Sequence, residues 1–121
     1  MDLREELSVV YDKVGSPTYA EDLARAIMQI ISDLESGKSQ FVPGIFNYSN
    51  EGVSSWYDLA MEVCRLINCT GHVFPIETHE YPVPAKRPVY SVLNKSRIKE
   101  VYGVEVPYWR DSLEKCIKNL L

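Results

Sequence analysis

"VVYDKVGSPTYAEDLA" (residues 9–24) joins an apolar run to an amphipathic segment through a turn that contains Gly15 and Pro17. Residues 7–12 are short and rich in β-branched side chains, which is typical of a strand. From residue 19 to residue 34 apolar side chains recur at helical spacing. A strand, a tight turn and a helix in this order predict an α/β protein.

The ends of this first helix carry recognisable signals. Thr18 is the expected N-cap, and Glu21, three residues later, is placed to complete a capping box. Gly37 follows the last apolar residue and is expected to end the helix.

The rest of the chain continues the alternation of strands and helices. Strands are predicted at residues 44–50 and 72–76, with a brief edge strand at 89–94. Helices are predicted from a cap at Ser54 or Ser55 to residue 67, near residues 94–103, and at 108–121. The helix after Ser55 is expected to pack through an apolar face made of Trp56, Leu59, Ala60, Val63, Cys64 and Ile67. Few short strands make a small sheet, so we expect further strands upstream of a single domain at 1–121.

The composition of the chain limits the classes of function that it can have. The 121 residues are 45% hydrophobic and 25% charged, with a net charge of −4. This balance is typical of a globular protein, and it argues against binding to nucleic acid or to an anionic membrane. The N-terminus lacks the apolar segment of a signal peptide, so a cytoplasmic location is expected. Three cysteines, at positions 64, 69 and 116, are expected to be free thiols, and the two histidines predict no metal site.

No catalytic motif is present. The six glycines are scattered, without the spacing of a dinucleotide- or nucleotide-binding loop. The nucleophile elbow Gly-x-Ser-x-Gly is also missing. The sequence therefore assigns no catalytic residue and no cofactor-binding residue to this chain.

Two segments are candidates for ligand binding. The loop after the first strand places Lys13 and Thr18 where α/β proteins usually meet ligands. Arg87 lies in "EYPVPAKRPVYSVLN" (residues 80–94), whose prolines stiffen the chain and reduce the ordering cost of binding a phosphate. The alternatives are a simple N-cap at Thr18, a surface lysine at Lys13 and a surface ion pair at Arg87.

Four stretches carry a family resemblance. They are "DKVGSPTYAEDLA", "GIFNYSNEGVSSWYDLA", "PIETHEYPVPAKRPVYSVLN" and "WRDSLEKCI". Together they resemble the C-terminal part of the dTDP-4-dehydrorhamnose reductase family, which belongs to the extended short-chain dehydrogenase/reductase superfamily.

The resemblance implies a substrate-binding part of a Rossmann-type reductase. The Gly-rich turn and the catalytic Tyr-x-x-x-Lys pair would then lie upstream, and no tyrosine here is followed four residues later by lysine. The implied parent reduces dTDP-4-dehydro-L-rhamnose with NADPH or NADH, and we expect it to form a homodimer. This chain alone is expected to bind no cofactor and to be inactive.

The resemblance also implies roles for single residues. Arg87, in the motif Pro-Ala-x-Arg-Pro, would bind the diphosphate of the dTDP-sugar, and Ser91 is a weaker candidate. Thr18 would lie near the sugar nucleotide. Lys13 stands where the family pattern has glutamine, and a lysine there could reach a phosphate.

Two other readings stay open. One is a non-catalytic relative, such as a regulatory subunit of methionine adenosyltransferase. The other is an extended short-chain enzyme that acts on a different nucleotide sugar.

Overall fold

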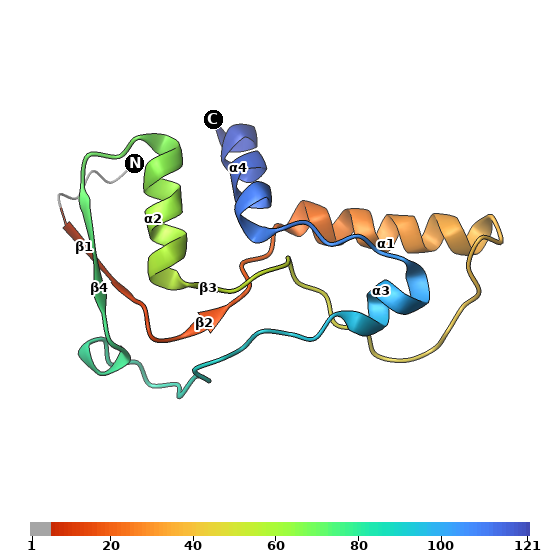
Figure 1. Cartoon of the computed structure of the whole chain (residues 1–121), viewed down its shortest axis with the longest axis horizontal. Helices are drawn as coiled ribbons and strands as arrows, with labels where there is room; N and C mark the ends of the chain where they lie inside the picture. The colour runs from red at the N-terminus through yellow and green to blue at the C-terminus, as the bar shows by residue number, and fades with distance from the viewer. Residues whose placement is uncertain (1–5) are drawn as a thin grey trace.

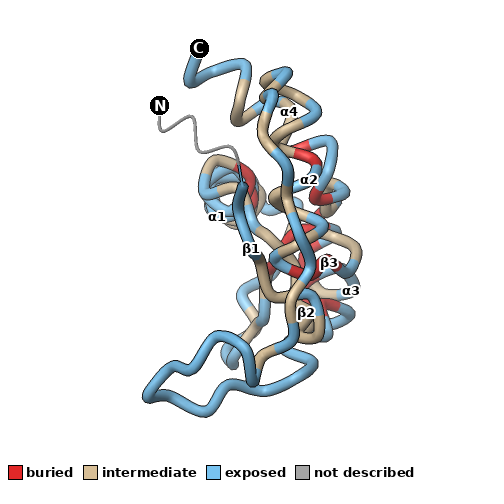
Figure 2. The backbone as a smooth tube through the Cα atoms, turned by 90° about the vertical axis from the view of Figure 1, so that its left-hand side faces the viewer, coloured by how far each residue is buried: buried red, intermediate tan, exposed pale blue. Residues whose placement is uncertain are grey.

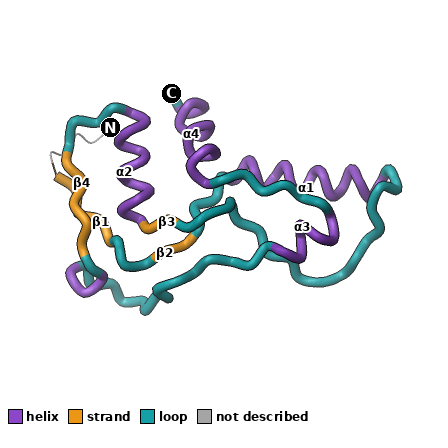
Figure 3. The backbone as a smooth tube through the Cα atoms, in the orientation of Figure 1, coloured by secondary structure: helices purple, strands orange, loops and turns teal. Residues whose placement is uncertain are grey.

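The computed structural model describes residues 6–121, so the acidic residues 1–5 lie outside the described part. Along the chain the elements are β1 (Glu6–Val10), β2 (Val14–Gly15), α1 (Ala20–Glu35), β3 (Ser54–Ser55), α2 (Trp56–Ile67), β4 (His72–Ile76), a 3-10 turn (Thr78–Glu80), α3 (Ser96–Tyr102) and α4 (Trp109–Leu120). Helices and short strands mix, as the sequence predicted. Long irregular stretches join them, above all between α1 and β3 and between β4 and α3 (Figure 3).

The larger sheet has two parallel strands. β1 pairs with β4 in a register that sets Leu7 beside Val73 and Val10 beside Ile76. Helix α2 packs against both strands and also against α4, so it stands between the sheet and the last helix (Figure 1). Leu7 and Phe74 remain 44% and 45% exposed, which leaves this small sheet without a complete cover.

A second, antiparallel ladder is formed by β2 and β3, with Val14 opposite Ser55 and Gly15 opposite Ser54. The strand predicted at 44–50 is wrong, since the described structure has no strand there. Ile45 is 83% exposed, whereas the polar Asn50 is fully buried, so this segment is held by side-chain hydrogen bonds. The edge strand predicted at 89–94 is reduced to one isolated bridge between Val14 and Tyr90.

The hydrophobic core lies between α1 and α3. It consists of Ala26, Ile98, Tyr102 and Val104, with Ile30, Leu34, Phe46, Tyr48, Val101 and Val106 packed around it. In Figure 2 the buried residues form a few separate patches in the middle of the molecule, and the loop after β4 stands out as an exposed arm. Much of α1 is uncovered, because Ile27 and Met28 are 48% and 63% exposed.

A buried polar cluster ties α1 to α4. The side-chain amide of Asn50 donates to Asp22 Oδ2 at 2.8 Å and to the carbonyl of Pro107 at 3.3 Å, and the Ser112 hydroxyl also donates to Asp22. Asn50 Oδ1 accepts from the backbone amide of Tyr19 at 2.7 Å. Because every one of these side chains is buried, the cluster fixes the start of both helices.

The capping box predicted at Thr18 is wrong. Helix α1 begins one residue later, with Tyr19 at the N-cap position and no side-chain cap. The hydroxyl of Thr18 instead donates to the carbonyl of Ser16 and accepts from the amide of Asn50. The choice between Ser54 and Ser55 is settled for Ser55, which forms a capping box with Asp58.

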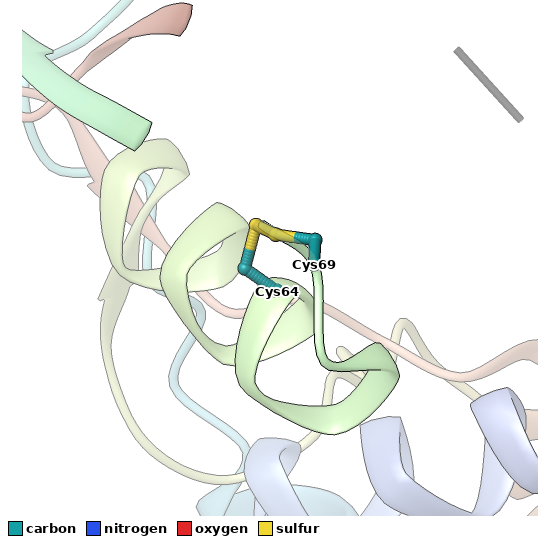
Figure 4. The surroundings of a disulfide bond; sticks show 2 residues. All are labelled: Cys64 and Cys69. Atoms are coloured by element: carbon teal, nitrogen blue, oxygen red, sulfur yellow. A yellow bond between two sulfur atoms is a disulfide. The ribbon is translucent and has the colours of Figure 1, made fainter. Parts of the chain in front are cut away.

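The cysteine prediction is partly wrong. Cys64 and Cys69 form a disulfide, shown in Figure 4, and Cys116 is free. Asn68 ends α2 in the left-handed conformation, and this turns the chain so that the amide of Cys69 donates to the carbonyl of Cys64. A reversal of this kind brings the two Cα atoms to 4.9 Å, within the usual range for a bridge, although the spacing is not that of a Cys-x-x-Cys pair.

Within residues 6–121, no helix combines the length and the apolar character that crossing a membrane requires.

Candidate functional site

A cleft of about 290 Å³ opens where β2, the start of α2 and the proline-rich segment meet. Its lining residues come from three places in the sequence. They are Lys13, Val14, Gly15, Ser16 and Pro17; Ser54, Ser55, Trp56 and Leu59; and Arg87, Pro88 and Ser91. The two segments singled out from the sequence, at 13–18 and 80–94, therefore meet at one site.

Backbone hydrogen bonds hold the proline-rich segment against β2. The amide of Val14 donates to the carbonyl of Val89 at 2.8 Å, and the amide of Ser91 donates back to the carbonyl of Val14 at 2.9 Å. The Ser91 hydroxyl donates to the same carbonyl at 3.1 Å. A Cβ atom on Gly15 would lie only 2.7 Å from this hydroxyl oxygen, so glycine permits the close approach.

These contacts change what can be expected of Ser91. Its hydroxyl proton is used by the carbonyl of Val14, so towards a ligand this oxygen is left as an acceptor. Ser91 lines the cleft, but its hydrogen bonds to Val14 hold the segment that carries Arg87 against β2.

Two positive charges line the cleft. Lys13 lies on one wall and Arg87 on another, and no Asp or Glu is among the lining residues. Among the described residues, neither side chain forms an ion pair, so both charges remain available to an anion. In a protein of net charge −4, a cleft with this composition is locally electropositive.

Thr18 is the sequence candidate that does not reach the cleft lining. Its hydroxyl contacts Ser16 and Asn50, as described above, and so stabilises the turn that leads into α1. Ser16 does line the cleft, and its hydroxyl donates to the carbonyl of Gly52 at 2.6 Å. Both hydroxyls shape the loop that follows β2.

The ends of the two parallel strands are locked together next to Lys13. The carboxylate of Asp12 accepts hydrogen bonds from the Thr78 hydroxyl at 2.6 Å and from the Thr78 amide at 3.0 Å. The hydroxyl, followed by the amide, lowers the pKa of Asp12 below its usual value. This contact fixes the residue that precedes Lys13, and hence the base from which the lysine extends.

Trp56 was not predicted as a site residue, because helical spacing assigned it to the packed face of α2. It lines the cleft instead and is 63% exposed. Its place as the first residue of α2 was the available signal.

Comparison with known proteins extends this description. The chain is 36% identical over 124 residues to the dTDP-4-dehydrorhamnose reductase of Sinorhizobium fredii, covering 99% of this chain and 42% of that enzyme. It is 38% identical to a dTDP-4-dehydrorhamnose reductase from Clostridium acetobutylicum of known structure, with a TM-score of 0.85 and coverage of 97% of this chain and 39% of the other.

A third similar protein is the dTDP-4-dehydrorhamnose reductase of Bacillus anthracis, whose structure was determined in complex with NADP. It is 32% identical, with a TM-score of 0.83, and the match covers 98% of this chain and 39% of that protein. The chain thus spans about two fifths of the length of the relatives it matches. The expected α/β architecture of an extended short-chain reductase is confirmed for this part.

The family model described as the RmlD substrate binding domain matches residues 1–121, and the chain belongs to this family.

Proposed function

We propose that residues 1–121 form the substrate-binding domain of an NADPH- or NADH-dependent reductase, and that the full-length protein reduces dTDP-4-dehydro-L-rhamnose to dTDP-L-rhamnose. The observation that carries this proposal is a cleft whose two cations form no ion pair and meet no carboxylate among the described residues, found in a chain of this family. A sugar nucleotide brings a diphosphate, which is the anion that such a cleft suits.

Arg87 and Lys13 are the residues that bind the diphosphate in this proposal. Arginine suits it because the planar guanidinium donates two parallel hydrogen bonds to phosphate oxygens, and lysine adds a point charge. Ser91 supports Arg87 by holding its segment, and Thr18 acts through the shape of the loop. The prolines on both sides of Arg87 lower the entropy lost when the arginine is immobilised.

The reaction itself belongs to residues outside this chain. Reduction at C4 needs a hydride from the reduced nicotinamide and a proton for the resulting alkoxide, supplied in this proposal by the upstream Tyr-x-x-x-Lys pair. The sequence has no Gly-x-Gly-x-x-Gly loop, the motif that binds a dinucleotide phosphate in Rossmann-type proteins. The isolated chain is therefore expected to oxidise no NADPH. We place the full-length enzyme in the cytoplasm, as a homodimer that size-exclusion chromatography tests.

A nuclear magnetic resonance titration of dTDP into the 121-residue chain tests the binding proposal. We expect amide shifts concentrated at residues 13–17, 54–56 and 87–91, with α3 unaffected as the internal reference. Shifts spread evenly over the chain, or none at millimolar dTDP, would contradict it. Turnover of NADPH by the isolated chain would contradict the proposal that the cofactor and the catalytic pair belong to the upstream region.

A further inference from the structure

Trp56 is the feature of the cleft that a diphosphate does not explain. A tryptophan buries a large apolar area when it packs, yet this one is 63% exposed at the cleft. The other tryptophan of the chain, Trp109, is 2% exposed. An exposed indole at a ligand cleft indicates an apolar surface that part of a ligand covers.

The start of α2 is held rigidly, so the indole is presented from a fixed point. The amide of Asp58 donates to the Ser55 hydroxyl at 3.0 Å, and the Ser55 amide donates to the Asp58 carboxylate at 3.1 Å. β3, which ends at Ser55, pairs with β2 and continues directly into α2 (Figure 1). Because the start of α2 is already held in place, little conformational entropy is lost when a ligand covers the indole.

The other lining residues define what covers it. Val14, Pro17, Leu59 and Pro88 give the cleft apolar walls, and Lys13 and Arg87 give it positive charge. A purely ionic ligand would leave the indole and these walls uncovered, and a purely apolar ligand would leave the cations unused. A nucleoside diphosphate satisfies both, because it joins a flat ring to a doubly charged chain.

We propose that the nucleobase of the bound nucleoside diphosphate stacks on the exposed indole of Trp56 while Lys13 and Arg87 hold the phosphates. This inference rests on the proposed function and adds to it the residue that recognises the base. Stacking is tolerant of the identity of the base, since every base has a π face. Trp56 therefore contributes affinity for a nucleotide over a simple phosphate.

Tryptophan fluorescence tests this directly, because the sequence has only two tryptophans and one of them is buried. Saturating dTDP is expected to change the emission of the wild-type chain and to protect it from quenching by acrylamide. Inorganic pyrophosphate, which has no base, is expected to do neither. In the Trp56→Phe variant the remaining signal, from Trp109, is expected to be insensitive to dTDP.

Affinity gives the second readout. Trp56→Ala is expected to weaken dTDP binding about tenfold by calorimetry, while Trp56→Phe, which keeps an aromatic face, stays within about threefold of the wild type. Unchanged emission and acrylamide quenching of the wild type at saturating dTDP would overturn the inference but leave the proposed function standing. If dTDP does not bind the chain at all, both are overturned. The acrylamide experiment uses the wild-type chain, so it decides the matter even if Trp56→Ala fails to fold.

Discussion

Replacing Asn50 by alanine removes the centre of the polar cluster that joins α1 to α4. Asn50 is fully buried, and its side chain makes three well-formed contacts. It accepts from the Tyr19 amide at 2.7 Å, and it donates to Asp22 at 2.8 Å and to the Pro107 carbonyl at 3.3 Å. Alanine fills none of these roles, and it leaves the buried Asp22 carboxylate with Ser112 as its remaining side-chain partner.

The expected loss follows from the groups that lose a hydrogen bond to Asn50. A buried polar group that loses its partner costs about 1–3 kcal/mol, and a carboxylate lies at the upper end of this range. The Pro107 carbonyl still accepts from the Glu51 amide at 2.8 Å, so only the Tyr19 amide and Asp22 count. Taking about 1 kcal/mol for the Tyr19 amide and about 2 kcal/mol for Asp22 gives about 3 kcal/mol. A domain of this size is stable by about 5–15 kcal/mol, so Asn50→Ala is expected to lose a large share of its stability.

Urea unfolding followed by circular dichroism measures this loss. With a slope of about 2 kcal/mol per molar urea, the midpoint is expected to fall by about 1.5 M. Asn47→Ala is the matched control, because Asn47 is an exposed asparagine of the same segment, and it is expected to change stability by less than about 0.5 kcal/mol. A loss below about 1 kcal/mol for Asn50→Ala would refute the idea that this cluster fixes the two helices.

Three further predictions concern stability. Cys64→Ser is expected to lower the free energy of unfolding by about 2 kcal/mol, since it opens the bridge to Cys69; equal stability of variant and wild type without reductant would contradict this. Asp12 has a lowered pKa in the folded chain because of Thr78, so its contribution is present at neutral pH and is lost as the pH falls below about 4; Asp12→Asn should flatten the acid limb of a stability–pH profile, and an unchanged limb would count against it. Gly52→Ala is expected to cost about 2 kcal/mol, because Gly52 has a φ of +95° and a Cβ there would lie 2.5 Å from a ring carbon; a melting temperature equal to the wild type would refute this.

The helices of the fold were predictable because their signals are local. Amphipathic spacing located α1, α2 and α4, and the expected cap at Ser54 or Ser55 placed the start of α2 to within one residue. The segment 44–50 was not predictable in the same way. Its alternating apolar residues are typical of a strand, but burying Ser49 and Asn50 to bond with distant helices outweighs that local preference. Thr18 failed as a cap for the same reason, since Asn50, 32 residues away, uses its hydroxyl.

The candidate site was predictable where chemistry alone marks a residue. The loop position after the first strand singled out Lys13, and charge in a proline-stiffened segment singled out Arg87. The structure brings both to one cleft. Trp56 could not be found from helical periodicity, because periodicity gives the face of a helix and not how far along its length the neighbours reach. The disulfide between Cys64 and Cys69 depends on the left-handed conformation of Asn68, and this conformation is seen in the structure but not in the sequence.

The central claim is that Arg87 in the cleft binds the diphosphate of a sugar nucleotide. Calorimetric titration of dTDP into the wild type, Arg87→Ala and Lys86→Ala tests it most directly, because Lys86 is an exposed neighbouring cation that does not line the cleft. Loss of one charge-assisted phosphate contact predicts at least about tenfold weaker binding for Arg87→Ala, and a change within about twofold for Lys86→Ala. Equal dissociation constants for Arg87→Ala and the wild type would contradict the claim.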